Sequence, residues 1–90
     1  GEEGPVRLVP EARRTLVFPD KLALVCERYG LTPREVEVLT ETIHGYSMEN
    51  IGKKLFVSRE TVKTHLRRLY QKLDIHKKQE LFALINSYVD

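Results

Sequence analysis

The sequence of 90 residues contains one cysteine, no tryptophan and no long apolar run. Because Cys26 stands alone, an internal disulfide and a metal site built from several thiolates are both excluded. No apolar stretch reaches the roughly 18 residues that a membrane-spanning helix requires. Since 41% of the residues are hydrophobic, the chain can still form one small domain around a single core.

Charge is unevenly distributed along the chain, although the net charge is only +2. Residues 53–78 contain nine lysines and arginines against two acidic residues, a net charge of +7, and the rest of the chain carries −5. A basic segment on an otherwise acidic domain is typical of a surface that binds nucleic acid. The charge alone leaves a second possibility open, a basic face that binds an acidic protein.

The first 19 residues have three prolines, two glycines and no sustained hydrophobic period. They predict a linker or arm, with a short extended piece at residues 14–18. From Asp20, a possible N-cap, apolar residues follow at helical spacing and predict a helix over residues 20–29 that ends at Gly30. The residues of this stripe are Leu22, Val25, Cys26 and Tyr29.

The next segment carries strong helix-start signals. Thr32 is an N-cap, Pro33 suits the first helical position, and Glu35 completes a capping box; Glu35 is also a candidate partner for a basic side chain. Gly45 ends this helix, and Ser47 caps a short one of about eight residues. Gly52 within that short helix indicates a close approach of another helix.

Two longer helices follow. Ser58 caps a helix over residues 58–73 with a straight apolar seam, and a last helix is expected over residues 78–89. The seam consists of Val62, Leu66, Leu69 and Leu73, and the apolar face of the last helix of Leu81, Leu84, Ile85 and Tyr88. Tyr70 is expected at the edge of the core, and His44 and His76 at helix ends. No strand pattern appears, so the predicted fold is all-α.

A short helix and a longer, basic helix joined by a turn at residues 56–57 predict a helix-turn-helix arrangement. The seam places Lys63, Thr64, Arg67 and Gln71 on the opposite face of helix 58–73. Lysine and arginine suit guanine O6 and N7, and Thr64 offers a methyl or a hydroxyl group to a base. The candidates for phosphate contact beside this face are Ser58, Arg59, Thr61, His65, Arg68 and Lys72.

Four motifs carry a family resemblance: LTPRE at 31–35, Gly45-x-Ser47, VSxxTVKxH at 57–65 and KLDI at 72–75. Together they resemble the LuxR/GerE-type DNA-binding domain of bacterial transcription regulators, over residues 31–89. The sequence departs from this pattern at Phe56, where the family often has glycine or another small residue, and at Gly52, where it often has alanine.

The resemblance implies a four-helix domain at about 31–89, preceded here by an extra helix at about 20–29, so that residues 20–90 form the DNA-binding domain. Helix 58–73 is then the recognition helix. The base-contacting positions of the family fall on Lys63, Thr64 and Arg67, and Thr61 and Lys72 are among its phosphate-side positions. The last helix is expected to form a homodimer on DNA, which fits the stripe of Leu81, Ile85 and Tyr88. This stripe can belong to the core of one chain, to a dimer interface or to both, and we expect both.

The resemblance also implies the functional setting. We expect a cytoplasmic output domain that binds double-stranded DNA sequence-specifically, with RNA polymerase as a further partner. The chain starts at Gly1 and its only methionine is Met48, so we expect an upstream sensory or receiver domain, with room for a membrane segment in the full-length protein. We predict no cofactor, no metal and no enzymatic activity, because the sequence contains no paired carboxylates, activated nucleophile or phosphate-binding glycine loop.

Overall fold

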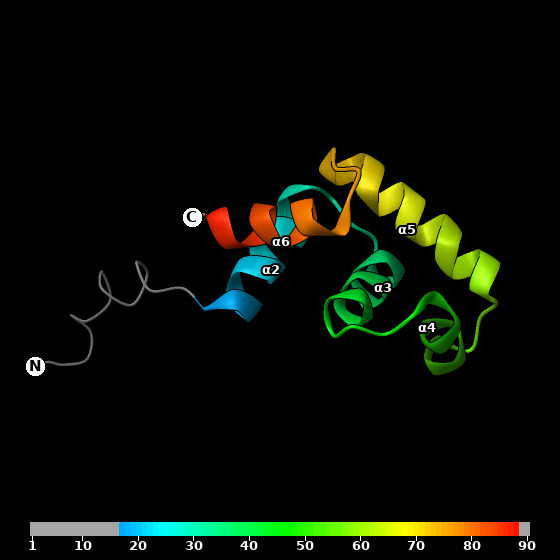
Figure 1. Cartoon of the computed structure of the whole chain (residues 1–90). Helices are drawn as coiled ribbons and strands as arrows, with labels where there is room; N and C mark the ends of the chain where they lie inside the picture. The colour runs from blue at the N-terminus through cyan, green and yellow to red at the C-terminus, as the bar shows by residue number, and fades with distance from the viewer. Residues whose placement is uncertain (1–16, 89–90) are drawn as a thin grey trace, which may run out of the picture.

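The computed structural model describes residues 17–88, and within this range the chain forms five α-helices and no strand (Figure 1). The all-α prediction is therefore confirmed. The helices are α2 (Phe18–Arg28), α3 (Pro33–Ile43), α4 (Met48–Leu55), α5 (Arg59–Leu73) and α6 (Lys78–Ser87). Most of the predicted arm lies outside the described residues.

Helix α2 starts earlier than the sequence predicted. Its N-cap is Val17, which makes no side-chain cap hydrogen bond, and Asp20 lies within the first turn. Pro19 permits this start because the first turn of a helix leaves its backbone N–H groups without intrahelical partners. Phe18 is consequently helical, not extended as predicted. At the other end, Gly30 adopts the predicted left-handed conformation, with φ +68°.

The N-terminal caps of α3, α4 and α5 are the predicted ones. Thr32 Oγ1 accepts a hydrogen bond from the Glu35 backbone N–H at 3.1 Å, and Glu35 Oε1 accepts one from the Thr32 backbone N–H at 2.9 Å. Ser47 and Ser58 cap α4 and α5 through bonds from the N–H groups three residues later. Three helix starts therefore follow from local side-chain chemistry.

The two departures from the family pattern, Phe56 and Gly52, both lie at the turn between α4 and α5. Phe56 ends α4 in the left-handed conformation with φ 59°, and its side chain is 92% exposed. This conformation costs a non-glycine residue about 1–2 kcal/mol. A Cβ atom at Gly52 would lie 2.7 Å from the Val57 carbonyl oxygen. Gly52 thus admits the backbone of the turn, whereas the sequence had indicated a helix crossing.

The helices pack in two groups (Figure 1). Helices α3, α4 and α5 contact one another, and the helix that α6 contacts most is α2. One hydrophobic core runs through both groups, because buried side chains from all five helices belong to a single cluster. On α5, this cluster contains Val62, Leu69 and Leu73, with Leu66 partly buried against it.

Of the two roles expected for the apolar face of α6, core and dimer interface, the structure confirms the first. Leu81 and Ile85 are both 0% exposed, so in this arrangement neither side chain offers a surface to a second copy. The reason is α2, which lies before the motifs and packs against α6. Of the three residues expected at a dimer interface, only Tyr88 is partly exposed.

None of the helices in residues 17–88 has the length and apolarity needed to cross a membrane.

Candidate nucleic-acid interface

Helix α5 presents a basic side opposite its buried row. Lys63, Arg67 and Arg68 are exposed, and Thr64 is partly exposed between them in the sequence. Since Val62, Leu69 and Leu73 are buried, the 3.6-residue period of the helix turns these side chains outward. The structure therefore brings the predicted base-contacting residues together on one open side of α5.

The outward cations have no counter-charge within the chain as far as it is described. No carboxylate in residues 17–88 lies within 4.0 Å of a charged nitrogen of Lys63, Arg67 or Arg68. The acidic residue of α5 that forms an ion pair is Glu60, whose Oε2 lies 3.6 Å from the Arg59 guanidinium. Lys63 and Arg67 are four residues apart, and like charges at this spacing repel one another on a free helix. An external anion along this side would relieve that repulsion.

Lys72 is bound differently from the other cations of α5. Its Nζ lies 2.7 Å from Glu35 Oε1 and donates a second bond to the Gly30 carbonyl at 3.2 Å. Burial would raise the pKa of the Glu35 carboxyl, but hydrogen bonds from Lys72 and Thr32 and the charge of Lys72 lower this pKa below its usual range. The expected pairing of Glu35 with a basic residue of α5 is confirmed. It attaches the end of α5 to the start of α3.

The predicted phosphate-contacting residues are spread over α5. Ser58 Oγ caps the helix and lies 3.0 Å from Thr61 Oγ1, so these two hydroxyls already hydrogen-bond to each other. His65 is partly buried, whereas Arg59 and Arg68 are exposed. With two donor bonds made inside the chain, Lys72 has one N–H left. Contact of these residues with phosphate stays a prediction.

The cations of α4 are less available. Lys54 Nζ lies 3.2 Å from Glu41 Oε1 and 4.2 Å from the centre of the Tyr46 ring. The bond to Glu41 raises the pKa of Lys54. His44 Nδ1 lies 3.6 Å from the same carboxylate oxygen. This cluster ties α4 to the end of α3, and among the lysines of α4 only Lys53 is exposed without an acidic partner in the described part of the chain.

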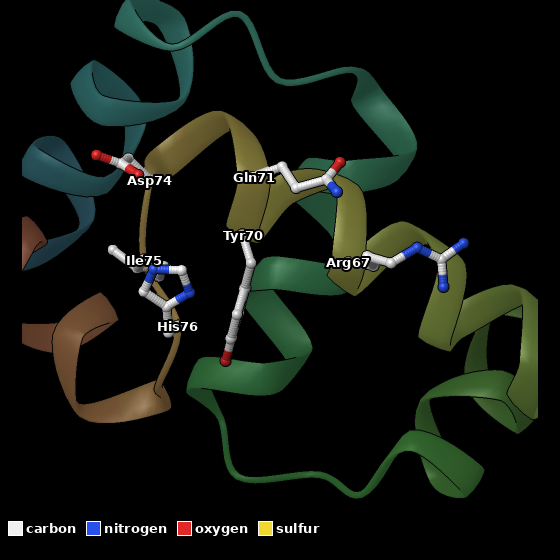
Figure 2. A pocket seen from close by; sticks show the side chains of 6 residues that line it. All are labelled: Arg67, Tyr70, Gln71, Asp74, Ile75 and His76. Atoms are coloured by element: carbon white, nitrogen blue, oxygen red, sulfur yellow. The ribbon is translucent and has the colours of Figure 1, made fainter.

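One feature beside α5 had no signal in the sequence. A hollow of about 370 Å³ lies between the second half of α5 and the turn that leads to α6 (Figure 2). It is formed by residues of the basic side together with residues of the turn: Arg67, Tyr70, Gln71, Asp74, Ile75 and His76. Tyr70 packs against the core at this point, as predicted. The hollow depends on Asp74, whose left-handed backbone (φ 56°) ends α5 and turns the chain, and nothing in the sequence indicated this conformation.

Comparison with known proteins places this geometry in context. Residues 29–85 match the family model described as bacterial regulatory proteins, luxR family. Over 60 residues the chain is 43% identical to the uncharacterized transcriptional regulatory protein YxjL of Bacillus subtilis (strain 168). That match covers 64% of this chain and 28% of YxjL, so the chain spans less than a third of the length of this relative. No solved structure was found to match.

Proposed function

This chain belongs to the LuxR family of bacterial regulatory proteins, and from that premise we propose that α5 binds in the major groove of a double-stranded DNA target and distinguishes its sequence. The domain itself is a helix-turn-helix DNA-binding domain of a transcription regulator. The observation that carries the proposal is the group of three outward cations on α5, Lys63, Arg67 and Arg68, which have no acidic partner in residues 17–88.

The dimensions of a helix support this placement. An α-helix with its side chains is about 10–12 Å wide, and the major groove of B-DNA is about 12 Å wide. Lys63 and Arg67 can donate to guanine O6 and N7, and Thr64 can contact a thymine methyl group. The inner side of α5 fixes the angle of the helix through its buried row and through the bond between Lys72 and Glu35.

Phosphate contacts are assigned to one edge of α5. Thr61, His65, Arg68 and Lys72 follow at i, i+4, i+7 and i+11 and therefore form a row beside the reading side. Ser58 and Arg59 add donors at the start of the helix, where backbone N–H groups also favour anions. These contacts orient α5 without reading bases.

Dimerisation on DNA stays a prediction of the family resemblance. Leu81 and Ile85 are buried between helices of one chain, so a second copy would have to use a different part of α6. Its outer side includes the exposed Gln79, Ala83 and Asn86, whereas Tyr88 follows the helix and packs against the core. Sedimentation equilibrium with and without a duplex containing two half-sites measures whether such pairing occurs.

The test of the proposed function starts with selection of preferred duplexes from a random pool. The protein is then titrated into the selected duplex and into a scrambled duplex, with fluorescence anisotropy as the readout, at several salt concentrations. These titrations should show sequence preference and a steep loss of affinity with salt. Lys63→Ala and Arg67→Ala should each weaken binding to the selected duplex by about 1–3 kcal/mol and relax preference at particular base pairs.

A matched control is Arg28→Ala on α2. Arg28 is exposed and its removal changes the net charge by the same amount, but we expect an unchanged sequence preference. If Lys63→Ala and Arg67→Ala leave sequence preference intact, the assignment of the reading side is wrong. Equal affinity for all duplexes, together with tighter binding to an acidic protein, would favour the alternative of a protein-binding basic face.

A further inference from the structure

The hollow beside α5 is bordered by side chains that differ in direction. Figure 2 shows Tyr70 and His76 on two sides of a gap, with the Tyr70 hydroxyl at its lower end. Arg67 and Gln71 extend over the outer side of α5, and the Asp74 carboxylate points to the opposite side from Arg67. The hollow therefore adjoins the basic side of α5, and its only carboxylate is turned away from the Tyr70 hydroxyl.

Four side chains at this hollow have no hydrogen-bond partner in the part of the chain that the structure describes. Within residues 17–88, the Tyr70 hydroxyl and the His76 ring make no hydrogen bond, and neither do the side chains of Arg67 and Gln71. His76 does use its backbone N–H, which donates to Glu80 Oε1. Burial raises the pKa of Tyr70, so its hydroxyl remains a neutral donor. A site with several free donors and an averted carboxylate suits an anionic ligand.

The position of the hollow follows from the rows of α5. The predicted phosphate contacts after the helix start all lie in one row, 61–65–68–72. On the other side of Thr64 and Arg67 lies a second row, which consists of Arg59, Tyr70, Asp74 and the proposed base-contacting Lys63 at its border with the reading side. A helix about as wide as the major groove brings both of its edges close to sugar-phosphate backbones. The hollow occupies the second edge, where the sequence had assigned only Arg59 to phosphate.

We propose that this hollow seats one phosphate group of the DNA strand that borders the major groove on the Tyr70 side of α5. The Tyr70 hydroxyl and the His76 imidazole donate hydrogen bonds to the phosphate oxygens, and Arg67 at the rim adds positive charge. This inference rests on the proposed function. It adds a second line of backbone contacts, so that α5 is held on both edges and not only on the edge of Arg68.

Substitutions that remove single donors test the proposal. Tyr70→Phe keeps the ring that packs against the core, and His76→Gln keeps a polar side chain at an exposed position. Each should weaken binding to the selected duplex about three- to tenfold, with the same factor for the scrambled duplex, because phosphate contacts carry no sequence information. Tyr29→Phe and His44→Gln are matched controls outside the hollow, for which we expect unchanged DNA affinity.

Neutral backbone linkages locate the phosphate. Methylphosphonate groups are placed one at a time along the selected duplex, and the affinity of the wild-type protein is measured for each. One position on the strand at the Tyr70 edge should weaken wild-type binding about tenfold. At that position the Tyr70→Phe/His76→Gln double variant should lose less than twofold, because the contact is already absent.

The outcomes separate the two claims. One outcome is that the wild-type protein binds the selected duplex in a salt-dependent way while the double variant binds it with the same affinity. In that case the hollow does not hold a phosphate and the inference is overturned, but the proposed function stands. If the affinity losses from the double variant and from the neutral linkage add fully, the two changes act on different contacts, and the inference is overturned in the same way. If 10 mM inorganic phosphate at constant ionic strength abolishes the difference in DNA affinity between wild type and double variant, free phosphate competes for the hollow, which supports the inference. No sequence-selective binding by the wild-type protein overturns both.

Discussion

The pair of helices α2 and α6 and the group of α3, α4 and α5 use their side chains in different ways (Figure 1). In the group, α5 has one buried row and an opposite side of cations without acidic partners among the described residues. In the pair, the apolar residues Leu81 and Ile85 of α6 are fully buried. Leu81 and Ile85, which were expected to serve both the core and a dimer interface, are thus buried within one chain, whereas the charges of α5 remain exposed.

This difference shows which kind of surface a short sequence can reveal. An unpaired charge is costly to bury, so a dense basic row that belongs to a folded helix must face solvent or an anion. An apolar stripe has no such restriction, because it is stabilised equally by a helix of the same chain or of another. The family match begins at residue 29, and the helix that contacts α6 most lies before it.

The largest effect is expected from a charge placed inside the pair. Leu81→Asp should destabilise the domain by more than about 4 kcal/mol, because an unpaired carboxylate would enter a fully buried position. A small domain has little stability beyond this, so circular dichroism should show an unfolded protein at 25 °C. Ala83→Asp, at an exposed position of the same helix, should retain the fold. If the Leu81→Asp protein stays folded and forms dimers on DNA less readily, Leu81 belongs to a dimer interface and not to the core.

The connection of α5 to α3 should give the next largest effect. Lys72→Met leaves Glu35, which is 3% exposed, without its cationic partner, and should cost about 1–3 kcal/mol at neutral pH. The folded state lowers the pKa of Glu35, so its stabilisation is present above the unfolded pKa of about 4.3 and is lost as the pH falls through the lower folded pKa. Urea denaturation of both proteins should show the difference at pH 7 and a much smaller one at pH 3.

Arg68→Met is the control for Lys72→Met. Arg68 lies in the same row of α5, is exposed, and has no carboxylate partner in the range 17–88. Its substitution should change the free energy of unfolding by no more than about 0.5 kcal/mol while reducing DNA affinity. Equal destabilisation by the two changes would mean that the pair of Lys72 and Glu35 contributes nothing specific to stability.

The smallest effect is expected at the surface of the pair. Lys21 Nζ donates a hydrogen bond to the Asn86 carbonyl at 3.1 Å, and this contact is exposed. Lys21→Ala should lower the melting temperature by no more than about 3 °C, since exposed polar contacts rarely exceed about 0.5 kcal/mol. Arg28→Ala on the same helix gives the baseline. A much larger shift would show that this bond, and not the buried side chains, holds α2 to α6.

The predictions that succeeded rest on contacts between close neighbours in the chain. Thr32, Ser47 and Ser58 hydrogen-bond with residues three positions away, so their caps follow from the local sequence. The start of α2 was placed too late because Asp20 is a good cap in isolation, yet Pro19 lets the helix begin before it. The purpose of Gly52 was assigned correctly as a close approach, but the approaching atoms belong to the turn at residue 57.

Helices α3, α4 and α5 and the basic side of α5 could be predicted from the sequence, because caps, the 3.6-residue period and like charges act over a few residues. Only the packed structure shows which cation of α5 pairs with Glu35 and that α2 covers α6. These outcomes depend on residues far apart in the chain, such as Glu35 and Lys72, whose contact exists only after α3 and α5 have packed together.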